Sequence, residues 1–261
     1  MREREFIQST LDDMAIFVRS KYAMRDGMRI STKREANDLL TEVDLAVQEE
    51  IVGRIQEEFP HDAIYGEEAG MNEVPADPDG RTWLIDPIDG TQNFVRGLFP
   101  AFGISLGFAE QGRPVVGGVA VPGRGELYLA EKGGGAFRNG ERIVVSDVGG
   151  LASARAEVDF SGPWDREEIL HRFSRLMVEI GQVRCHCAAV IGLCSIATAD
   201  MDAYVHVALN PFDYAAAMII VEEAGGRVTR LNGGPIHLFD GGRGVLASNG
   251  LLHDSLRSII V

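Results

Sequence analysis

The chain contains 261 residues, of which 45% are hydrophobic, and it carries a formal net charge of −14. That length and apolar content allow a large buried core, either as one large domain or as two closely packed halves. The negative charge argues against a broad surface for nucleic acid or anionic membrane, because binding to polyanions depends on neutralising phosphates with Lys and Arg.

The N-terminal region predicts two helices. Apolar residues recur at helical spacing over residues 7–22, and the opposite face is charged. The charged residues 2–5 precede this helix, so the N-terminus does not resemble a secretory signal peptide. A second helix is predicted over residues 41–59, and Thr41 and Asp44 at its start have the spacing of a capping box. Asp44 therefore has a structural interpretation as a capping acid.

An apolar, strand-like segment over residues 83–85 leads into two aspartates, Asp86 and Asp89. Pro87 favours an extended backbone at Asp86, so Asp86 and Ile88 share one edge of the chain, and the following turn brings Asp89 beside them. Two carboxylates and one backbone carbonyl then converge. Such hard oxygen donors suit Mg²⁺ or Mn²⁺ and match zinc or copper poorly, because those metals favour nitrogen and sulfur.

Gly90 and Thr91 follow at the point where the strand breaks and a helix can begin. Their amides would lie at the N-terminus of that helix, a position that attracts phosphate. Metal ligands beside an anion site suggest metal-assisted phosphoryl chemistry. A turn closed by a helix cap explains the same Asp, Gly and Thr residues, so this segment alone leaves both interpretations open.

Beyond the central segment, strands come first and then alternate with helices. The dipeptide Asn139-Gly140 predicts a type I′ hairpin turn. The longest apolar run, residues 215–221, is far shorter than the roughly 18 residues that a membrane span needs. The alternation of strands and helices along the chain indicates a layered α/β fold. The predicted strands cover 103–108, 115–121, 126–130, 203–207, 227–230 and 244–247, the helices cover 166–180 and 213–223, and a small-residue apolar run covers 188–199.

The cysteines Cys185, Cys187 and Cys194 are odd in number, which fits reduced thiols in the cytoplasm better than a disulfide framework. The segment Cys185-His186-Cys187 invites a metal-site hypothesis. We reject that hypothesis at this point, because the two thiol side chains are expected to diverge and no second Cys/His pair lies at zinc spacing.

Besides residues 83–94, two further acidic segments stand out, Gly66-Glu67-Glu68 and Phe212-Asp213-Tyr214-Ala215. Together with the segment around Asp44, these three segments resemble, in order and separation, the inositol monophosphatase family of magnesium-dependent, lithium-sensitive phosphatases. That family carries a Gly-Glu-Glu segment, the signature Trp-x-Ile-Asp-Pro-(Ile/Leu)-Asp-Gly-Thr-x-Asn-Phe, and a later Trp-Asp-x-Ala segment. The resemblance runs from about residue 5 to the C-terminus. The matching stretches of this chain are Gly66-Glu67-Glu68, residues 83–94 and Phe212-Asp213-Tyr214-Ala215.

The resemblance implies the sugar-phosphatase fold, an α/β arrangement of alternating helix and sheet layers with the site between two halves. Residues 1–147 would form an N-terminal half that carries most metal ligands. Residues 148–261 would form a C-terminal half that completes the substrate pocket. Members of the family are commonly dimers, so a homodimer is expected.

The resemblance also implies two or three Mg²⁺ ions, for which Mn²⁺ can substitute. Glu67, Asp86 and the carbonyl of Ile88 would bind the first ion. Asp86, Asp89 and Asp213 would bind the second, so Asp86 would bridge the two ions.

By the same resemblance, Glu67 and Thr91 are the residues that would orient or deprotonate an attacking water. The hydroxyl of Thr91 would relay to Asp44, whose capping role does not exclude this second one. The amides of Gly90 and Thr91 would hold the phosphate.

Substrate selectivity is the least specific part of the resemblance. In inositol-cleaving members an acid shortly before the Asp213 position contacts ring hydroxyls, and His206 stands there in this chain. An imidazole cannot reproduce a carboxylate that accepts two hydroxyl hydrogen bonds, so His206 either alters selectivity or is a strand-end histidine without a ligand role. Ala188 and Ala189 are expected to face the sugar. Arg96 stands where many inositol enzymes carry histidine, and it either favours a more anionic substrate or forms a surface ion pair.

The expected partner is a small-molecule phosphate monoester. Inositol monophosphate is the first candidate and histidinol phosphate the next, while fructose 1,6-bisphosphate, 3′-phosphoadenosine 5′-phosphate and NADP stay open. A weakly catalytic, metal-dependent sensor or interaction protein is the alternative from a different class. Magnesium-dependent release of phosphate distinguishes the two classes.

Overall fold

The computed structural model describes residues 2–25, 28–32, 39–68, 70–97, 99–159, 166–242 and 244–260. Its helices are α1 (Arg2–Ala23), α2 (Glu42–Glu58), α3 (Thr91–Arg96), α4 (Arg166–Glu179), α5 (Ala189–Ala197), α6 (Pro211–Glu223) and α7 (His253–Ile260), with a 3-10 turn η1 (Leu151–Ser153). Its strands are β1 (Ile30–Thr32), β2 (Leu39–Thr41), β3 (Ala63–Gly66), β4 (Thr82–Asp89), β5 (Gly103–Glu110), β6 (Arg113–Val121), β7 (Glu126–Glu131), β8 (Gly135–Arg138), β9 (Glu141–Ile143), β10 (Arg155–Asp159), β11 (Gln182–Arg184), β12 (Ala203–His206), β13 (Arg227–Thr229) and β14 (Val245–Ser248).

The strands form two large sheets and a small antiparallel pair, β1 with β2. The seven-stranded sheet has the order β3-β4-β5-β6-β7-β8-β9, and its strands are antiparallel apart from the parallel pair β3 and β4. The five-stranded sheet has the order β11-β10-β12-β14-β13. There β10 is parallel to both of its neighbours, and the pairs with β14 are antiparallel.

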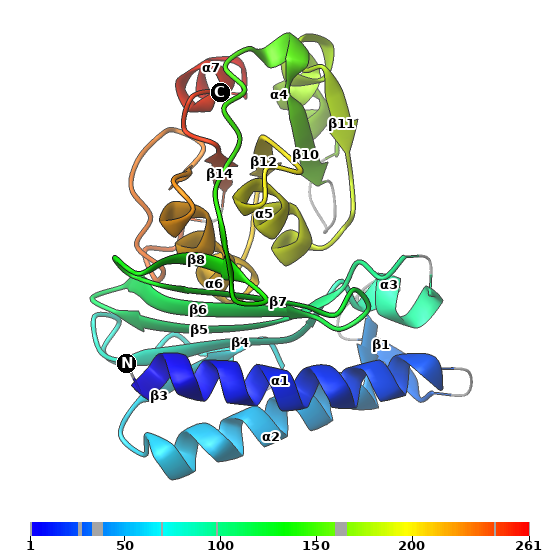
Figure 1. The fold of residues 1–261 in the computed structure, drawn as a ribbon, viewed down its shortest axis with the longest axis vertical. Helices are drawn as coiled ribbons and strands as arrows, with labels where there is room; N and C mark the ends of the chain where they lie inside the picture. Colours follow the sequence, from blue (N-terminus) through cyan, green and yellow to red (C-terminus); the bar gives the residue numbers. More distant parts are fainter. Residues whose placement is uncertain are drawn as a thin grey trace.

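Helices and sheets are stacked in alternating layers (Figure 1). The helices α1 and α2 cover one face of the seven-stranded sheet, and α6 covers the other. The helix α5 packs against α6, so both lie between the two sheets. The outer face of the five-stranded sheet carries α4 and α7. The predicted α/β fold of alternating helix and sheet layers is confirmed.

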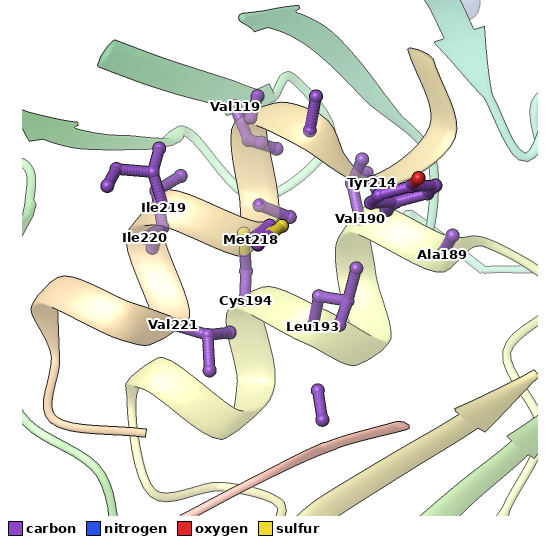
Figure 2. Packing of buried hydrophobic residues seen from close by; sticks show 14 of the residues in the cluster. Val119, Ala189, Val190, Leu193, Cys194, Tyr214, Met218, Ile219, Ile220 and Val221 are labelled. Atoms are coloured by element: carbon purple, nitrogen blue, oxygen red, sulfur yellow. The ribbon is translucent and has the colours of Figure 1, made fainter. Parts of the chain in front are cut away.

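The central layer is packed closely against the seven-stranded sheet. Figure 2 shows Val190 and Cys194 of α5 beside Met218 of α6 and Val119 of β6, all of them buried. A Cβ atom added at Gly117 would lie 2.5 Å from the carbonyl oxygen of Ala216, so only glycine lets α6 approach β6 this closely. Each fully buried Ile, Val or Met side chain here stabilises the fold by about 1.5 to 3 kcal/mol.

Most predicted elements are confirmed, but one helix starts earlier than predicted and several elements were missed. Asn139 and Gly140 have φ values of 50° and 82°, as a type I′ turn requires. The helix α6 begins at Pro211, before the predicted start, because Pro suits the first helical position and Asp213 accepts a hydrogen bond from the Asn210 amide at 2.6 Å. The sequence analysis missed β1, β2, β10, β11 and α7. None of the described helices has the length and apolarity needed to cross a membrane.

The buried His253 makes the stability of the C-terminal region sensitive to acid. Its ring nitrogens lie 2.9 Å from the hydroxyl oxygens of both Ser248 and Thr229, and burial lowers its pKa to about 4. An unfolded histidine titrates near pH 6.5. The neutral ring therefore contributes its full stabilisation above about pH 6.5, and that contribution is lost as the pH falls towards 4.

We expect the free energy of unfolding to drop by up to about 3 kcal/mol from this residue alone between pH 7 and pH 4. Urea denaturation at a series of pH values measures the drop, and His253→Gln serves as the reference that cannot titrate. Parallel curves for the wild type and the variant would contradict this role of His253.

Candidate functional site

The strand β4 brings the central aspartates to the inner face of the seven-stranded sheet. Ile85 packs on the side of α1 and α2, whereas Leu84 packs on the side of α6. Side chains alternate along a strand, so Asp86 shares the α6 side with Leu84. Asp86 is buried, and its Oδ1 accepts a hydrogen bond from the amide of Ile88 at 3.1 Å. A register shift against β5 between Asp86 and Asp89 marks a bulge, which redirects the chain at this point.

The hydrogen bond and the pKa of Asp89 show which groups surround its carboxylate. Its Oδ2 accepts a hydrogen bond from the amide of Val190, at the start of α5, at 2.7 Å. Burial raises the pKa of Asp89 well above its usual range, and the carboxylates of Asp213, Asp159 and Glu67 raise it further by repulsion between like charges. Acids from both large sheets and from α6 therefore lie close enough to Asp89 for their charges to act on it, and positive charge at Asp89 would relieve this repulsion.

The positions of Glu67 and Asp213 follow from neighbouring elements. The parallel strands β3 and β4 end at the same edge of their sheet, and the Glu67 amide donates to the carbonyl of Ile85 at 3.1 Å. Glu67 consequently lies beside the end of β4. Asp213 occupies the first turn of α6, where the Asn210 amide fixes its Oδ2. Glu67 thus approaches from the strand that neighbours β4, and Asp213 from the helix that covers this face of the sheet.

Thr91 connects this cluster to α2. Its hydroxyl oxygen lies 2.9 Å from the carbonyl of Ile88 and 3.3 Å from Oδ1 of Asp44. The other Asp44 oxygen accepts from the amide of Thr41 at 2.9 Å, which completes the predicted capping box of α2. Asp44 thus caps a helix and contacts Thr91 at the same time. The capping role is confirmed, and the relay from Thr91 to Asp44 stays a prediction.

Gly90 lets the second half of the chain approach the first. It has φ of 83° and precedes α3, and a Cβ atom there would lie 3.0 Å from the Cβ of Ala188. Ala188 and Ala189 are both buried at the start of α5. Asn93 donates through its side-chain amide to the carbonyls of Ala101 and His186, each at 2.7 Å. The chain around Ala188 is therefore fixed beside the anion site predicted at Gly90.

His206 and Arg96 differ in their distance from this cluster. His206 ends β12, is buried, and stands in register with Asp159 of β10. Its Nδ1 accepts from the amide of Ala208 at 3.0 Å, and burial lowers its pKa, so the ring is neutral near pH 7. Arg96 is exposed on α3, where its Nε lies 3.2 Å from the side-chain oxygen of Gln92. That contact is neither an ion pair nor part of the acidic cluster.

Two features near the cluster were missed from the sequence. Asp159 is buried at the end of β10 and contributes to the acidic field at Asp89. The prediction that the thiols of Cys185 and Cys187 diverge is wrong, because their sulfur atoms lie 3.6 Å apart. Both features depend on how β10 and the loop before α5 meet in space, which local patterns do not encode.

Known proteins are similar to this chain in sequence and in fold. The sequence model of the inositol monophosphatase family matches residues 3–261. The chain belongs to that family. It is 37% identical over 235 residues to the Thermotoga maritima protein named fructose-1,6-bisphosphatase/inositol-1-monophosphatase, an alignment that covers 88% of this chain and 86% of that one. It is 36% identical over 222 residues to human inositol monophosphatase 2, covering 83% and 76%.

The fold agrees with the sequence comparison. The solved structure of a Thermotoga maritima inositol monophosphatase superimposes with a TM-score of 0.87 at 33% identity, covering 100% of this chain and 97% of that one. The resemblance predicted from the acidic segments is confirmed. As a member of the inositol monophosphatase family, the chain is a phosphoric monoester hydrolase related to sugar-phosphate phosphatases.

Proposed function

We propose that this inositol monophosphatase family member hydrolyses a small sugar or polyol phosphate with the help of Mg²⁺, and that inositol monophosphate is the first candidate substrate. The observation that carries the proposal is the gathering of acids around Asp89, which draws on Glu67 after β3 and Asp213 on α6. The Thermotoga maritima relative is also named for fructose 1,6-bisphosphate, which makes that sugar phosphate the second candidate. The proposal also divides the chain into an N-terminal half, residues 1–147, and a C-terminal half, residues 148–261.

The donor set is consistent with magnesium. Buried carboxylates that repel one another need cations, and carboxylate and carbonyl oxygens are the ligands Mg²⁺ prefers. Glu67, Asp86 and the Ile88 carbonyl would hold one ion, and Asp86, Asp89 and Asp213 a second; Mn²⁺ would substitute, and a third ion stays open. When bound, such ions supply positive charge that polarises the phosphoryl group and lowers the pKa of water.

The residues around the ions would position the reactants. The hydroxyl of Thr91 has two acceptors, the Ile88 carbonyl and Asp44, so its proton can turn towards Asp44 while its lone pairs accept a hydrogen bond from the attacking water. Glu67 would orient the same water and accept its proton. The amides of Gly90 and Thr91, at the first turn of α3, would donate to the phosphate.

Phosphate release from a panel of substrates tests this function. We expect Mg²⁺-dependent turnover of inositol 1-phosphate above that of histidinol phosphate, 3′-phosphoadenosine 5′-phosphate and NADP, with fructose 1,6-bisphosphate as the closest competitor. Protein stripped of metal with EDTA is the control and should be inactive until Mg²⁺ or Mn²⁺ is added. A protein that releases no phosphate from any substrate with either metal would instead be the sensor or interaction protein.

His206 is the residue with which to test selectivity. A neutral buried imidazole offers one donor where a carboxylate would accept two hydroxyl hydrogen bonds. We expect His206→Glu to raise the rate ratio of inositol 1-phosphate to fructose 1,6-bisphosphate about tenfold, the value of one well-placed charged hydrogen bond. His206→Gln is the matched neutral control. Equal ratios in all three proteins would show that His206 does not select the substrate.

Three further properties belong to the same proposal. Lithium should inhibit by competing at the ion site of Asp213. None of Cys185, Cys187 and Cys194 is in a disulfide, which is consistent with a cytoplasmic location. A homodimer is the expected assembly, and light scattering after size exclusion measures it.

A further inference from the structure

A second group of metal-ligand atoms adjoins the acidic cluster but differs from it in chemistry. Cys185, Cys187 and Asp159 each offer one ligand atom, and these three atoms lie within 4.8 Å of one another. Asp159 is buried, whereas both cysteines are exposed, so an ion can reach the group from solvent. The structure thus contradicts one of our two reasons for rejecting this segment as a metal site, the expected divergence of the thiols.

The separation of the two thiols matches the geometry of a bound soft metal. Two thiolates at about 2.3 Å from a tetrahedral zinc ion lie roughly 3.8 Å apart. The Sγ atoms of Cys185 and Cys187 are 3.6 Å apart. Cys187 has φ of 54°, a left-handed conformation that is uncommon outside glycine and that turns the chain between α5 and the preceding strand. Little movement is therefore needed to place both sulfurs on one ion.

The loop that carries the thiols is fixed to both of its neighbours. The amide and Nδ1 of His186 lie 3.0 Å and 2.7 Å from the two carboxylate oxygens of Glu157. The carbonyl of His186 accepts from Asn93 at 2.7 Å. Asp159 follows Glu157 by two residues on β10, so both side chains leave the same face of that strand. Strand and loop hold the three ligands in place before any ion binds.

We propose that Cys185, Cys187 and Asp159 form a binding site for one thiophilic divalent ion such as Zn²⁺. Two thiolates and one carboxylate fill three tetrahedral positions and leave the fourth for water or another ligand. Thiolate ligands favour Zn²⁺ or Cd²⁺ over Mg²⁺, so this site and the all-oxygen cluster sort metals by softness. The proposal is independent of the phosphatase reaction.

Cadmium titration tests the site directly, because thiolate-to-cadmium absorption in the ultraviolet reports sulfur ligands and is silent for carboxylates. The full chain is reduced, stripped of metal, supplied with saturating Mg²⁺ and titrated with Cd²⁺ without oxygen. We expect the band to reach its plateau at one equivalent per chain. Competition with a coloured chelator should give the same stoichiometry for Zn²⁺.

Matched variants identify the ligands. Cys185→Ser and Cys187→Ser should each lose at least half of the band and bind Cd²⁺ at least tenfold more weakly, whereas Asp159→Asn should keep the band and weaken binding. Cys194→Ala, which removes the third, buried thiol, should leave both properties unchanged. Circular dichroism checks that each variant is folded.

Three results would overturn the proposal. The first two are the absence of a band in the wild type and an equal band in the double serine variant. The third is a protein in which Cys185 and Cys187 re-form a disulfide once the reductant is removed, so that only the thiol of Cys194 titrates.

Discussion

Replacing Asp86 with asparagine should lower the turnover number about 1,000-fold, which corresponds to about 4 kcal/mol of transition-state stabilisation. Asp86 is the residue that we propose bridges the two ions, so its charge supports both. Asparagine keeps the size of the side chain and the oxygen that accepts from Ile88, which at present lies 3.1 Å from the amide. Phosphate release at saturating substrate and Mg²⁺ measures the loss.

The fold of this variant should be intact. Removing one negative charge from a crowded, buried cluster relieves repulsion, so the melting temperature of the metal-free variant should equal or exceed that of the metal-free wild type. Asp12→Asn, an exposed aspartate on α1, is the control for loss of one charge and should keep full activity. Turnover of Asp86→Asn within tenfold of the wild type would argue against a bridging ligand.

Replacing Thr91 with alanine should lower kcat about 100-fold, whereas Thr91→Ser should keep most of the activity. The hydroxyl lies 2.9 Å from the Ile88 carbonyl and 3.3 Å from Asp44, and serine preserves it. In the proposed reaction this hydroxyl holds the attacking water. Steady-state kinetics on the same substrate compare the two variants.

The Thr91 variants also separate catalysis from helix capping. Asp44 keeps its contact with the Thr41 amide at 2.9 Å in either variant, so the free energy of unfolding should change by less than about 1 kcal/mol. A serine variant as slow as the alanine variant would mean that the methyl group matters and the hydroxyl does not.

The candidate site was accessible to sequence analysis wherever an acid stands beside a strong local signal. Asp86 and Asp89 lie in the last part of β4, just before Gly90, and Asp213 follows Pro211 at the start of an apolar helix. Strand ends, turn glycines and helix starts are short-range features, so one sequence suffices to place these acids on their elements. Their roles as metal ligands stay predictions.

The strand β10 shows why other parts could not be predicted. It carries Arg155, Glu157 and Asp159 at alternating positions, so its charge pattern hides a buried strand. Glu157 is buried because its carboxylate binds the amide and ring of His186, which is 29 residues away in sequence. The approach of the two thiols likewise follows from the backbone at Cys187, where no glycine signals a left-handed turn.

The close seating of α6 on the glycines of the seven-stranded sheet has a consequence for how relatives diverge. Because Gly117 leaves no gap beneath Ala216, the helix that presents Asp213 has almost no freedom to slide over the strands. Ala188 at the start of α5 and His206 at the end of β12, in contrast, stand at the ends of their elements. If these two residues select the substrate as proposed, mutation can remodel substrate preference there over evolutionary time while the proposed metal site keeps a constant geometry.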